Sequence, residues 1–372
     1  MNTVKIRHRL SKTLNAFSCA FSKIQKKVVF ESFYGNLFCD NPRAICEKMH
    51  ELYPEYELVW GVREIGKGTF PDYVKVCELS SFQYRRERAA AIAYIRNEAM
   101  TEDLYKRKNQ VFIQTWHGDR GFKKILYDSW VNTKRPDEVM DNQLTDLFVV
   151  GSDYAEKRIQ TAFRYHGKVM KKGSPRNDCL VYPKDVETVR NKLNIPEGKK
   201  ILLYAPTLKK GKKILDVNVD LKETLEQLGE DWVGLVKAHP KSLGLDLDDS
   251  DLLTDVSAYP DMSDLLMIAD LLITDYSSSA GDFILRRKPV ILAQFDKEEY
   301  ENSIRELYVS CEEIGYFIAG NQEELNSLIR GMTAQKAEEN CDKIMNYYGV
   351  QETGHSAEEV CRWINEQYMR MR

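Results

Sequence analysis

Short apolar runs alternate with longer amphipathic stretches along the chain from residue 28 onward. Runs rich in Val, Ile, Leu and aromatic residues predict buried strands. In the first half of the chain these runs are residues 28–33, 56–62, 89–95, 111–116 and 147–150. In the second half they are residues 199–204, 232–238, 271–274 and 289–293. Because helix-like stretches separate the strands, the pattern predicts an α/β fold with doubly wound parallel sheets.

The alternating pattern stops between residues 168 and 198, where Lys, Gly and Pro are frequent, and then starts again. This interruption predicts two α/β domains, the first at residues 28–175 and the second, with C-terminal helices, at residues 176–372. A length of 372 residues with 43% hydrophobic residues is enough for two separate cores. Near the start of the first domain, Asn41 before Pro42 predicts the N-cap of a helix.

The first 27 residues differ from the rest of the chain because they include basic residues and no acidic residue. Apolar residues recur there at helical spacing, which predicts an amphipathic helix over residues 1–27. Its apolar stripe consists of Ile6, Leu10, Leu14, Phe17, Phe21 and Ile24. Such a helix binds an anionic membrane surface or packs on its own domain, and the one-sided charge favours the membrane. Since neither a membrane-spanning run nor a secretion signal is present, we expect peripheral attachment to the cytoplasmic face of the membrane.

The overall composition excludes several other classes of function. A formal net charge of −3 gives no general attraction to nucleic acid, so we expect no nucleic-acid partner. The eight cysteines lack CxxC spacing, and the six histidines include no HExxH motif. We therefore expect reduced thiols, no structural zinc and no cofactor.

A cluster of serines follows the expected strand at residues 271–274. Ser277, Ser278 and Ser279 stand where the next helix is expected to begin. Helix-start N–H groups are unpaired and carry partial positive charge, and α/β sheets bind phosphate at the carboxyl ends of their strands. An ordinary helix cap needs one hydroxyl, so three in succession favour an anion site over a plain N-cap.

His117 is the first candidate for acid–base chemistry. It follows the strand at residues 111–116 and precedes Gly118, which leaves space beside the imidazole. A neutral imidazole can take a proton from a hydroxyl group near pH 7. The alternative is a packed or surface histidine whose hydrogen bond the nearby Asp119 satisfies.

Cationic and imidazole side chains also stand at strand ends and turns of the second half. Lys237 lies two residues before His239, at the end of the strand at residues 232–238, so the two share one face of that strand. There they can face a diphosphate leaving group, or simply form a solvated rim. Arg176 lies in a turn rich in Ser, Pro, Asn and Asp, and its guanidinium can bind a phosphate through two parallel hydrogen bonds.

In order and spacing, motifs across most of the chain resemble the CDP-glycerol glycerophosphotransferases, which build teichoic acids and related polymers. The motifs are residues 30–33, 41–43, 114–118, 173–178, 204–207, 239–240, 259–266, 274–278, 282–283 and 288–289. Each motif is weak by itself, whereas the ordered set is specific.

This resemblance implies a GT-B arrangement of two Rossmann-like domains with the active site in the cleft between them. The second domain would bind a CDP-activated polyol, and the first would receive a lipid-linked acceptor. His117 would be the base that deprotonates the acceptor hydroxyl, which attacks the phosphorus so that CMP leaves. The diphosphate contacts that the resemblance implies are Arg176, Thr207, His239, Ser277 and Ser278, with Asp275 shaping the loop.

One motif departs from the family pattern. Where the family usually has Thr-Pro-Leu-Lys after His-Gly, this chain has Asp119-Arg120-Gly121-Phe122-Lys123-Lys124. Since this loop is expected on the acceptor side, Asp119, Arg120 and Lys123 are candidate acceptor contacts. The departure leaves both glycerol phosphate and ribitol phosphate open as the transferred group.

Two other function classes stay open. A GT-B glycosyltransferase that uses a nucleotide sugar would share the fold and the phosphate loop. An inactive, membrane-associated partner protein would bind nucleotide weakly, and the altered loop at residues 119–121 favours it. The presence of both His117 and His239 argues against this last class.

Overall fold

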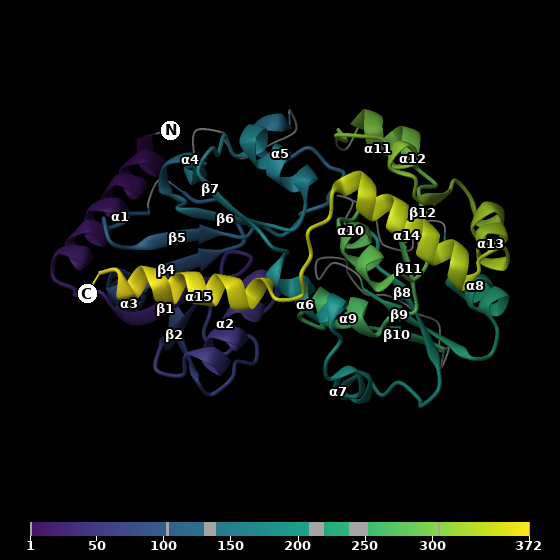
Figure 1. Cartoon of the computed structure of the whole chain (residues 1–372), viewed down its shortest axis with the longest axis horizontal. Coiled ribbons are helices and arrows are strands. Elements are labelled where there is room, and N and C mark those ends of the chain that lie inside the picture. Colours follow the sequence, from purple (N-terminus) through teal and green to yellow (C-terminus); the bar gives the residue numbers. More distant parts are fainter. Residues whose placement is uncertain are drawn as a thin grey trace.

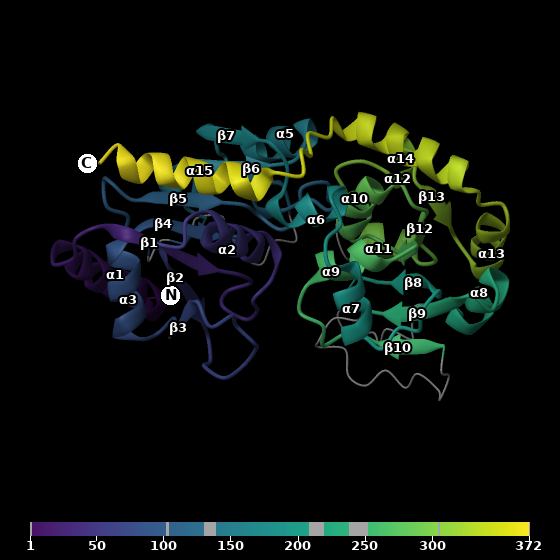
Figure 2. The ribbon, with the colours of Figure 1, turned by 60° about the horizontal axis from the view of Figure 1, so that its bottom comes forward.

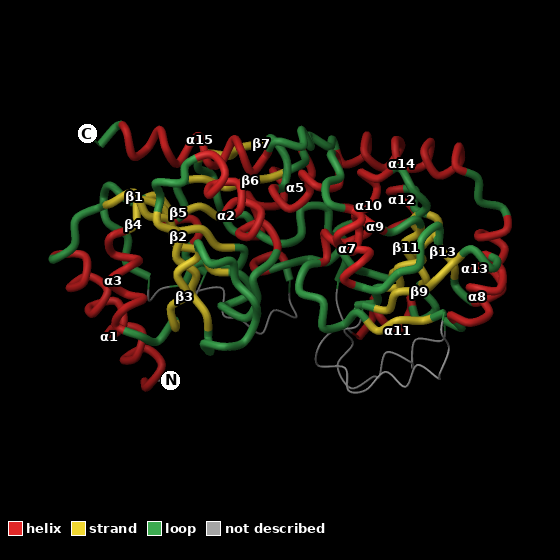
Figure 3. Tube along the Cα trace, turned by 90° about the horizontal axis from the view of Figure 1, so that it is seen from below, coloured by secondary structure: helices red, strands yellow, loops and turns green. Residues whose placement is uncertain are grey.

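The structure is a computed structural model that describes residues 2–101, 104–129, 139–207, 219–237, 252–303 and 306–371. Two parallel sheets lie side by side along the long axis of the molecule, one in each domain (Figure 1). Helices surround the strands in both domains (Figures 2 and 3). The α/β fold predicted from the alternating pattern is confirmed.

Seven of the described strands form the first sheet, in the order β3-β2-β1-β4-β5-β6-β7, and six form the second, in the order β10-β9-β8-β11-β12-β13. The first sheet contains β1 (Gln25–Glu31), β2 (Glu57–Val62), β3 (Val74–Glu78), β4 (Ala91–Arg96), β5 (Val111–Gln114), β6 (Leu147–Val150) and β7 (Lys168–Lys171). The second contains β8 (Lys200–Tyr204), β9 (Trp232–Val236), β10 (Leu253–Asp255), β11 (Leu271–Thr274), β12 (Val290–Ala293) and β13 (Phe317–Ala319). The strand order reverses between β1 and β4 and between β8 and β11, and such switch points are where α/β sheets bind ligands.

The helices that connect the strands vary from a single turn to several turns. The α-helices are α1 (Asn2–Ala20), α2 (Asp40–Leu52), α3 (Phe82–Ala90), α4 (Asp141–Leu144), α5 (Asp153–Ala162), α6 (Asp178–Val181), α7 (Val186–Lys192), α8 (Leu221–Leu228), α9 (Met262–Ile268), α10 (Ser279–Phe283), α11 (Lys297–Ser303), α12 (Cys311–Ile314), α13 (Gln322–Arg330), α14 (Ala334–Tyr348) and α15 (Ser356–Met369). The 3-10 helices are η1 (Leu126–Asp128), η3 (Pro175–Asn177) and η5 (Ile284–Arg286).

Both faces of each sheet are covered by helices. In the first sheet, Val28 of β1 packs in a core with Ile45 of α2, whereas the next residue, Val29, packs in a core with Tyr84 of α3. Burial on both faces explains why the sequence shows continuous apolar runs at the strands rather than alternating ones. The parallel pairing of every neighbouring strand has the same basis, because crossover helices cover the faces.

The C-terminal helix α15 returns to the first domain. After α14 crosses the second domain, the chain runs back so that α15 lies against α2 and β4 (Figures 1 and 2). Val360, Cys361 and Ile364 of α15 are buried in the core of the first sheet. The structure therefore differs from the expected division at residues 176–372, because an amphipathic helix joins whichever core has an open groove, and sequence spacing does not reveal which.

The N-terminal elements also differ in detail from the sequence expectation. Helix α1 ends at Ala20, and residues 25–27 of the expected helical segment belong to β1. The expected N-cap at Asn41 is wrong, because α2 begins at Asp40 and its N-cap residue is Cys39. Asp40 has a left-handed φ of 64°, which turns the chain sharply into the helix. Among the described helices, none has an apolar stretch long enough to cross a membrane.

Candidate active site

The imidazole of His117 is held at the carboxyl edge of the first sheet, just after β5. Its Nδ1 lies 2.7 Å from the backbone oxygen of Asn97, which follows β4. Because a carbonyl oxygen only accepts hydrogen bonds, Nδ1 carries the proton and Nε2 is the basic nitrogen of the neutral ring. Phe33 and Trp116 flank the ring with centroid distances of 5.3 and 4.1 Å. The ring is thus fixed in position and tautomer, as a general base requires.

Glu98 is a neighbour of His117 that the sequence analysis missed. One carboxylate oxygen of Glu98 lies 3.8 Å from Nδ1 of His117, and the side chain is largely buried. Burial raises the pKa of the Glu98 carboxyl, and the charge of His117 opposes that rise. A carboxylate at this position stabilises the imidazolium that forms when His117 accepts a proton. Its only sequence signal is a place two residues after a strand, which many glutamates share.

Asn41 braces the backbone that carries His117. Its side-chain amide donates hydrogen bonds to the backbone oxygens of Thr115 and Trp116 at 3.3 and 2.9 Å. Trp116 has a left-handed φ of 49°, an unfavourable conformation for a bulky residue that needs support from its surroundings. The carbonyl oxygen of the Asn41 side chain accepts from the backbone N–H of Arg176 at 3.0 Å, so the support reaches the domain joint.

The serine cluster lies where it was predicted, directly after β11 at the switch point of the second sheet. Ser278 is the N-cap of α10 and makes no side-chain capping bond, and Ser277 and Ser279 hydroxyl oxygens are 2.9 Å apart. The loop that carries His117 packs on this cluster, since a Cβ atom added to Gly118 would lie 3.4 Å from Ser278 Oγ. The residue that follows His117 in the first domain therefore lies against the serine cluster of the second domain.

Thr207 and Asp275 lie beside the serine cluster and are joined by a hydrogen bond. One oxygen of Asp275 accepts from the backbone N–H groups of Thr207 and Tyr276 at 2.8 and 2.5 Å. The hydroxyl of Thr207 is buried and has no hydrogen-bond partner among the described residues. A buried hydroxyl without a partner is costly unless a ligand or water satisfies it.

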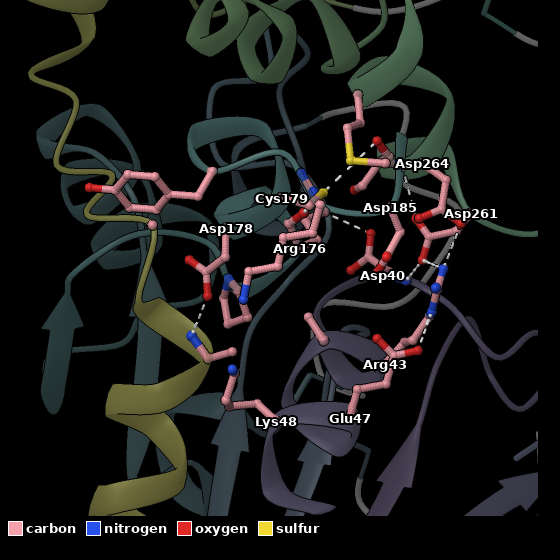
Figure 4. Close-up of a pocket in the computed structure, with 18 of the residues that line it drawn as sticks. Asp40, Arg43, Glu47, Lys48, Arg176, Asp178, Cys179, Asp185, Asp261 and Asp264 are labelled. Atoms are coloured by element: carbon pink, nitrogen blue, oxygen red, sulfur yellow. Dashed lines mark hydrogen bonds and ion pairs between the residues drawn. The ribbon is translucent and has the colours of Figure 1, made fainter. Parts of the chain in front are cut away.

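The cations predicted to bind phosphate are engaged with protein groups. The ammonium group of Lys237 donates to the backbone oxygens of Ser257 and Tyr259 at 2.9 and 2.5 Å, and burial lowers its pKa. The guanidinium of Arg176 is buried and lies 2.9 Å from a carboxylate oxygen of Asp40 (Figure 4). It also lies 2.9 Å from a carboxylate oxygen of Asp282. His239 lies outside the described residues.

Two of the candidate acceptor contacts point into the protein, which differs from the expectation. Asp119 accepts hydrogen bonds from the backbone N–H of Gly151 and the hydroxyl of Ser152, both at 2.6 Å. Arg120 is fully buried and faces the second domain. Lys123 is half-exposed and forms an antiparallel bridge with Leu307. Side-chain direction is not encoded in loop composition, so the sequence could not distinguish these orientations.

A polar cavity of about 640 Å³ lies at the joint between the domains, bordered by α2, α6, α7, α9 and the start of α15 (Figure 4). Arg43 of α2 reaches across it to Asp264 and Asp261 at 2.9 and 3.2 Å. The backbone N–H of Asp40 also donates to Asp261 at 2.9 Å. These contacts hold α2 against α9. Across the part of the chain that the structure describes, no group of three side chains suited to a metal ion comes together.

The chain is similar in sequence to a known family of transferases and to two staphylococcal proteins. Residues 13–366 match the family described as CDP-glycerol:poly(glycerophosphate) glycerophosphotransferase. The chain is 29% identical to the teichoic acid glycerol-phosphate transferase of Staphylococcus aureus, over 98% of this chain and 99% of that protein. It is 32% identical to the teichoic acid poly(glycerol phosphate) polymerase of Staphylococcus epidermidis, over 77% of this chain and 42% of the polymerase. The chain thus spans less than half the length of that polymerase.

Solved structures of the wall teichoic acid polymerase TagF are also similar. One superposes with a TM-score of 0.84 at 26% identity, covering 99% of this chain and 97% of that chain. A TagF variant soaked with CDPG superposes with a TM-score of 0.85 at 26% identity, with the same coverage. These matches confirm the predicted GT-B type of fold with two Rossmann-like domains.

Proposed function

The chain belongs to the CDP-glycerol:poly(glycerophosphate) glycerophosphotransferase family, and we propose that it transfers a polyol phosphate, glycerol phosphate first of all, from a CDP-activated donor. The acceptor is a hydroxyl of a lipid-linked polymer or primer, and CMP is released. The product is a teichoic acid or a related cell-surface polymer. The observation that carries this proposal is the meeting of His117, with its basic Nε2, and the serine cluster after β11.

The proposed reaction is one in-line displacement at phosphorus. The acceptor hydroxyl gives its proton to Nε2 of His117 while its oxygen forms a bond to the phosphorus that carries glycerol. The bond from that phosphorus to the bridging oxygen breaks, and the electron pair leaves with CMP. The backbone oxygen of Asn97 and the carboxylate of Glu98 hold the imidazolium until it loses its proton.

On the donor side, hydroxyl and backbone N–H groups at the start of α10 receive the negative charge of the diphosphate. Ser277 and Ser278 are half-buried after β11. The buried hydroxyl of Thr207, which has no hydrogen-bond partner among the described residues, follows the neighbouring strand β8. His239 completes this set as a proposed diphosphate contact. Arg176 already pairs with the carboxylates of Asp40 and Asp282. We therefore assign Arg176 to the joint between the domains rather than to direct phosphate binding.

The function is tested by measuring CMP release from CDP-glycerol and from CDP-ribitol in the presence of a glycerol-phosphate-primed lipid acceptor. CMP release that depends on the acceptor supports the proposal, and the more active donor identifies the polyol. A chain that releases UDP or GDP from a nucleotide sugar instead is a glycosyltransferase. A chain that binds neither type of donor is the inactive partner protein.

The serine cluster gives a prediction about donor affinity. In the double variant Ser277→Ala, Ser278→Ala, the Kd for CDP-glycerol is expected to rise about 10- to 100-fold, because two hydroxyl groups no longer donate to charged oxygens. Isothermal titration calorimetry measures this Kd directly. Ser310→Ala, which removes the N-cap of the remote helix α12, is the matched control. An unchanged donor Kd in the double variant contradicts the phosphate assignment.

We also propose that α1 attaches the protein to the cytoplasmic face of the membrane. The helix is held on its own domain through polar contacts, since Arg85 of α3 lies 3.3 Å from both the hydroxyl of Ser11 and the side-chain oxygen of Asn15. Its apolar stripe is left outward, with Phe17 60% exposed and Phe21 77% exposed. An apolar stripe beside basic residues suits an anionic lipid surface, where a lipid-linked acceptor is presented.

This attachment predicts a loss of vesicle binding when the stripe is made polar. The triple variant Leu10→Ser, Phe17→Ser, Phe21→Ser is expected to bind anionic vesicles at least about 10-fold more weakly, because exposed apolar area no longer enters the bilayer. Vesicle sedimentation provides the measurement, and turnover on a soluble acceptor is expected to stay unchanged. Point variants are preferable to removal of residues 2–27, which would delete the start of β1. Equal vesicle binding by the wild type and the triple variant rules out this role.

A further inference from the structure

A cluster of buried side chains, five charged and one amide, joins the two domains beside the candidate active site. We call it the joint cluster. Its members are Asp40, Arg120, Arg176, Asn177, Asp282 and Glu352. The side chain of each is largely shielded from solvent. They come from α2, the loop after β5, η3, α10 and the segment between α14 and α15. The cluster therefore connects five separate parts of the chain.

Arg120 makes the most contacts in the joint cluster. Its Nε donates to the backbone oxygen of Gly281 at 2.6 Å, and Nη2 donates to Asp282 at 2.9 Å, so one edge of the guanidinium is fixed on α10. Nη1 donates to Glu352 at 2.7 Å and lies 3.3 Å from Asp119. The guanidinium is planar and rigid, so four contacts in different directions fix the position of the loop that carries it.

The backbone of the loop that carries Arg120 also packs on α10 and on Ser278. A Cβ atom added to Gly281 would lie 2.5 Å from Cβ of Arg120 and 2.9 Å from its backbone oxygen. On the other side of the loop, Cβ atoms added to Gly118 and Gly121 would each lie 3.4 Å from atoms of Ser278. The contact at position 281 leaves no room for a larger residue than glycine, so α10 and the loop of Arg120 approach each other closely there.

The loop held by Arg120 contains His117 at its start. Arg120 is the third residue after His117, and α10 carries Ser278 and Ser279 at its start. The position of the base relative to the donor-phosphate hydroxyls is therefore set by the contact between Arg120 and α10. An apolar side chain could stabilise a domain joint as well as a buried ion pair does, so the charged arrangement is better explained by fixed geometry than by stability.

From this arrangement, and resting on the function proposed above, we infer that Arg120 is a positioning residue that fixes His117 at the distance from the donor phosphate at which the acceptor hydroxyl can attack. In-line displacement requires the reacting atoms to be about 3 to 3.5 Å apart, and a displacement of about 1 Å costs about 100-fold in rate.

The test uses variants of the full chain that keep the buried charges balanced. Arg120→Met alone would leave the carboxylate of Glu352 without its cation, so we pair it with Glu352→Gln. Asp282 retains its hydrogen bonds from Arg176 and Asn177 in that double variant.

Two further variants disturb the loop while all buried charges stay present. Arg120→Lys keeps the positive charge but loses the planar guanidinium, and Gly281→Ala places a methyl group against the backbone of Arg120. Arg362→Met, an exposed arginine on α15, is the control.

Turnover, donor affinity, melting temperature and hydrogen exchange are measured on each variant. We expect kcat for acceptor-dependent CMP release to fall about 100-fold in the double variant and about 10-fold in Arg120→Lys and Gly281→Ala, with the Kd for CDP-glycerol within about two-fold of the wild type. Amide exchange of residues 117–121 is expected to speed up while the melting temperature of Arg120→Lys stays close to that of the wild type.

A folded double variant with wild-type kcat and unchanged exchange at residues 117–121 would overturn the inference and leave Arg120 a purely structural residue. Loss of donor binding together with kcat would also overturn it, because positioning of the base does not touch the donor. If the wild type itself transfers no polyol phosphate, the proposed function fails instead, and the exchange measurement still decides whether Arg120 holds the loop.

Discussion

Replacing His117 with alanine is expected to lower the kcat of polyol-phosphate transfer about 1,000-fold, because removal of a general base costs between about 100- and 10,000-fold. The contacts that His117 makes with described residues involve Nδ1 and the ring faces, so the basic Nε2 is left for the acceptor. Donor binding is expected to change by less than about two-fold, since the imidazole acts on the acceptor hydroxyl and not on the diphosphate. Steady-state CMP release and calorimetric titration of CDP-glycerol measure the two quantities separately.

The matched control for this variant is His166→Ala, which removes an exposed imidazole from the first domain. It is expected to leave both kcat and donor affinity unchanged. The assignment of His117 as base fails if His117→Ala loses donor binding as strongly as turnover, because a diphosphate contact would then explain the loss. It also fails if turnover survives at more than about one-tenth of the wild-type rate.

The parts of the site that the sequence predicted well are those fixed by local periodicity. Apolar runs located β5 and β11, and therefore located the strand ends at which His117 and the serines of residues 277–279 stand. A parallel sheet brings the carboxyl ends of its strands to one edge. The ends of β5 and β11 therefore indicated that each domain presents polar groups along one edge of its sheet. The switch points between β1 and β4 and between β8 and β11 lie on these edges, and α/β sheets commonly bind ligands at such points.

The parts that the sequence did not predict are contacts between residues distant in the chain. Arg120 meets Glu352, which is 232 residues away, and Asp282, which is 162 residues away. In the sequence these residues are ordinary members of a chain with 30% charged residues. Asn41 was interpreted as a helix cap because its neighbour is Pro42, whereas tertiary contacts with Thr115 and Trp116 use its side chain. A local sequence pattern does not show whether an asparagine side chain bonds to its own helix or to a distant backbone group.

The joint cluster helps to fix the two domains relative to each other through ion pairs. Arg176 binds Asp40 of the first domain and Asp282 of the second, and Arg43 binds Asp264 across the same joint. Ion pairs resist sliding because their energy depends on direction as well as distance. Helix α15 adds a covalent route, since it returns from the second domain to the core of the first. The ion pairs and helix α15 therefore act together to fix the orientation of the two domains.

Within this cluster Asp282 carries the largest expected effect on stability. Its carboxylate accepts from Arg120, Arg176 and Asn177, each at 2.9 Å. Burial by itself would raise the pKa of this carboxyl, but the charges of Arg176 and Arg120 hold it below its usual value. Since both guanidinium groups are buried, loss of the shared carboxylate leaves two cations in a medium that solvates them poorly.

The isosteric variant Asp282→Asn is therefore expected to lower the free energy of unfolding by about 3 to 5 kcal/mol at pH 7. Because the folded state lowers the pKa of Asp282, its contribution to stability is present above about pH 4, the value for an unfolded aspartate, and is lost as the pH falls through the lower folded value. The difference between wild type and variant should shrink accordingly in acid. Urea denaturation followed by tryptophan fluorescence at several pH values measures it, with the exposed Asp231→Asn as control. A difference below about 1 kcal/mol at pH 7, the size expected of a surface pair, would mean that water or relaxation compensates the two arginines.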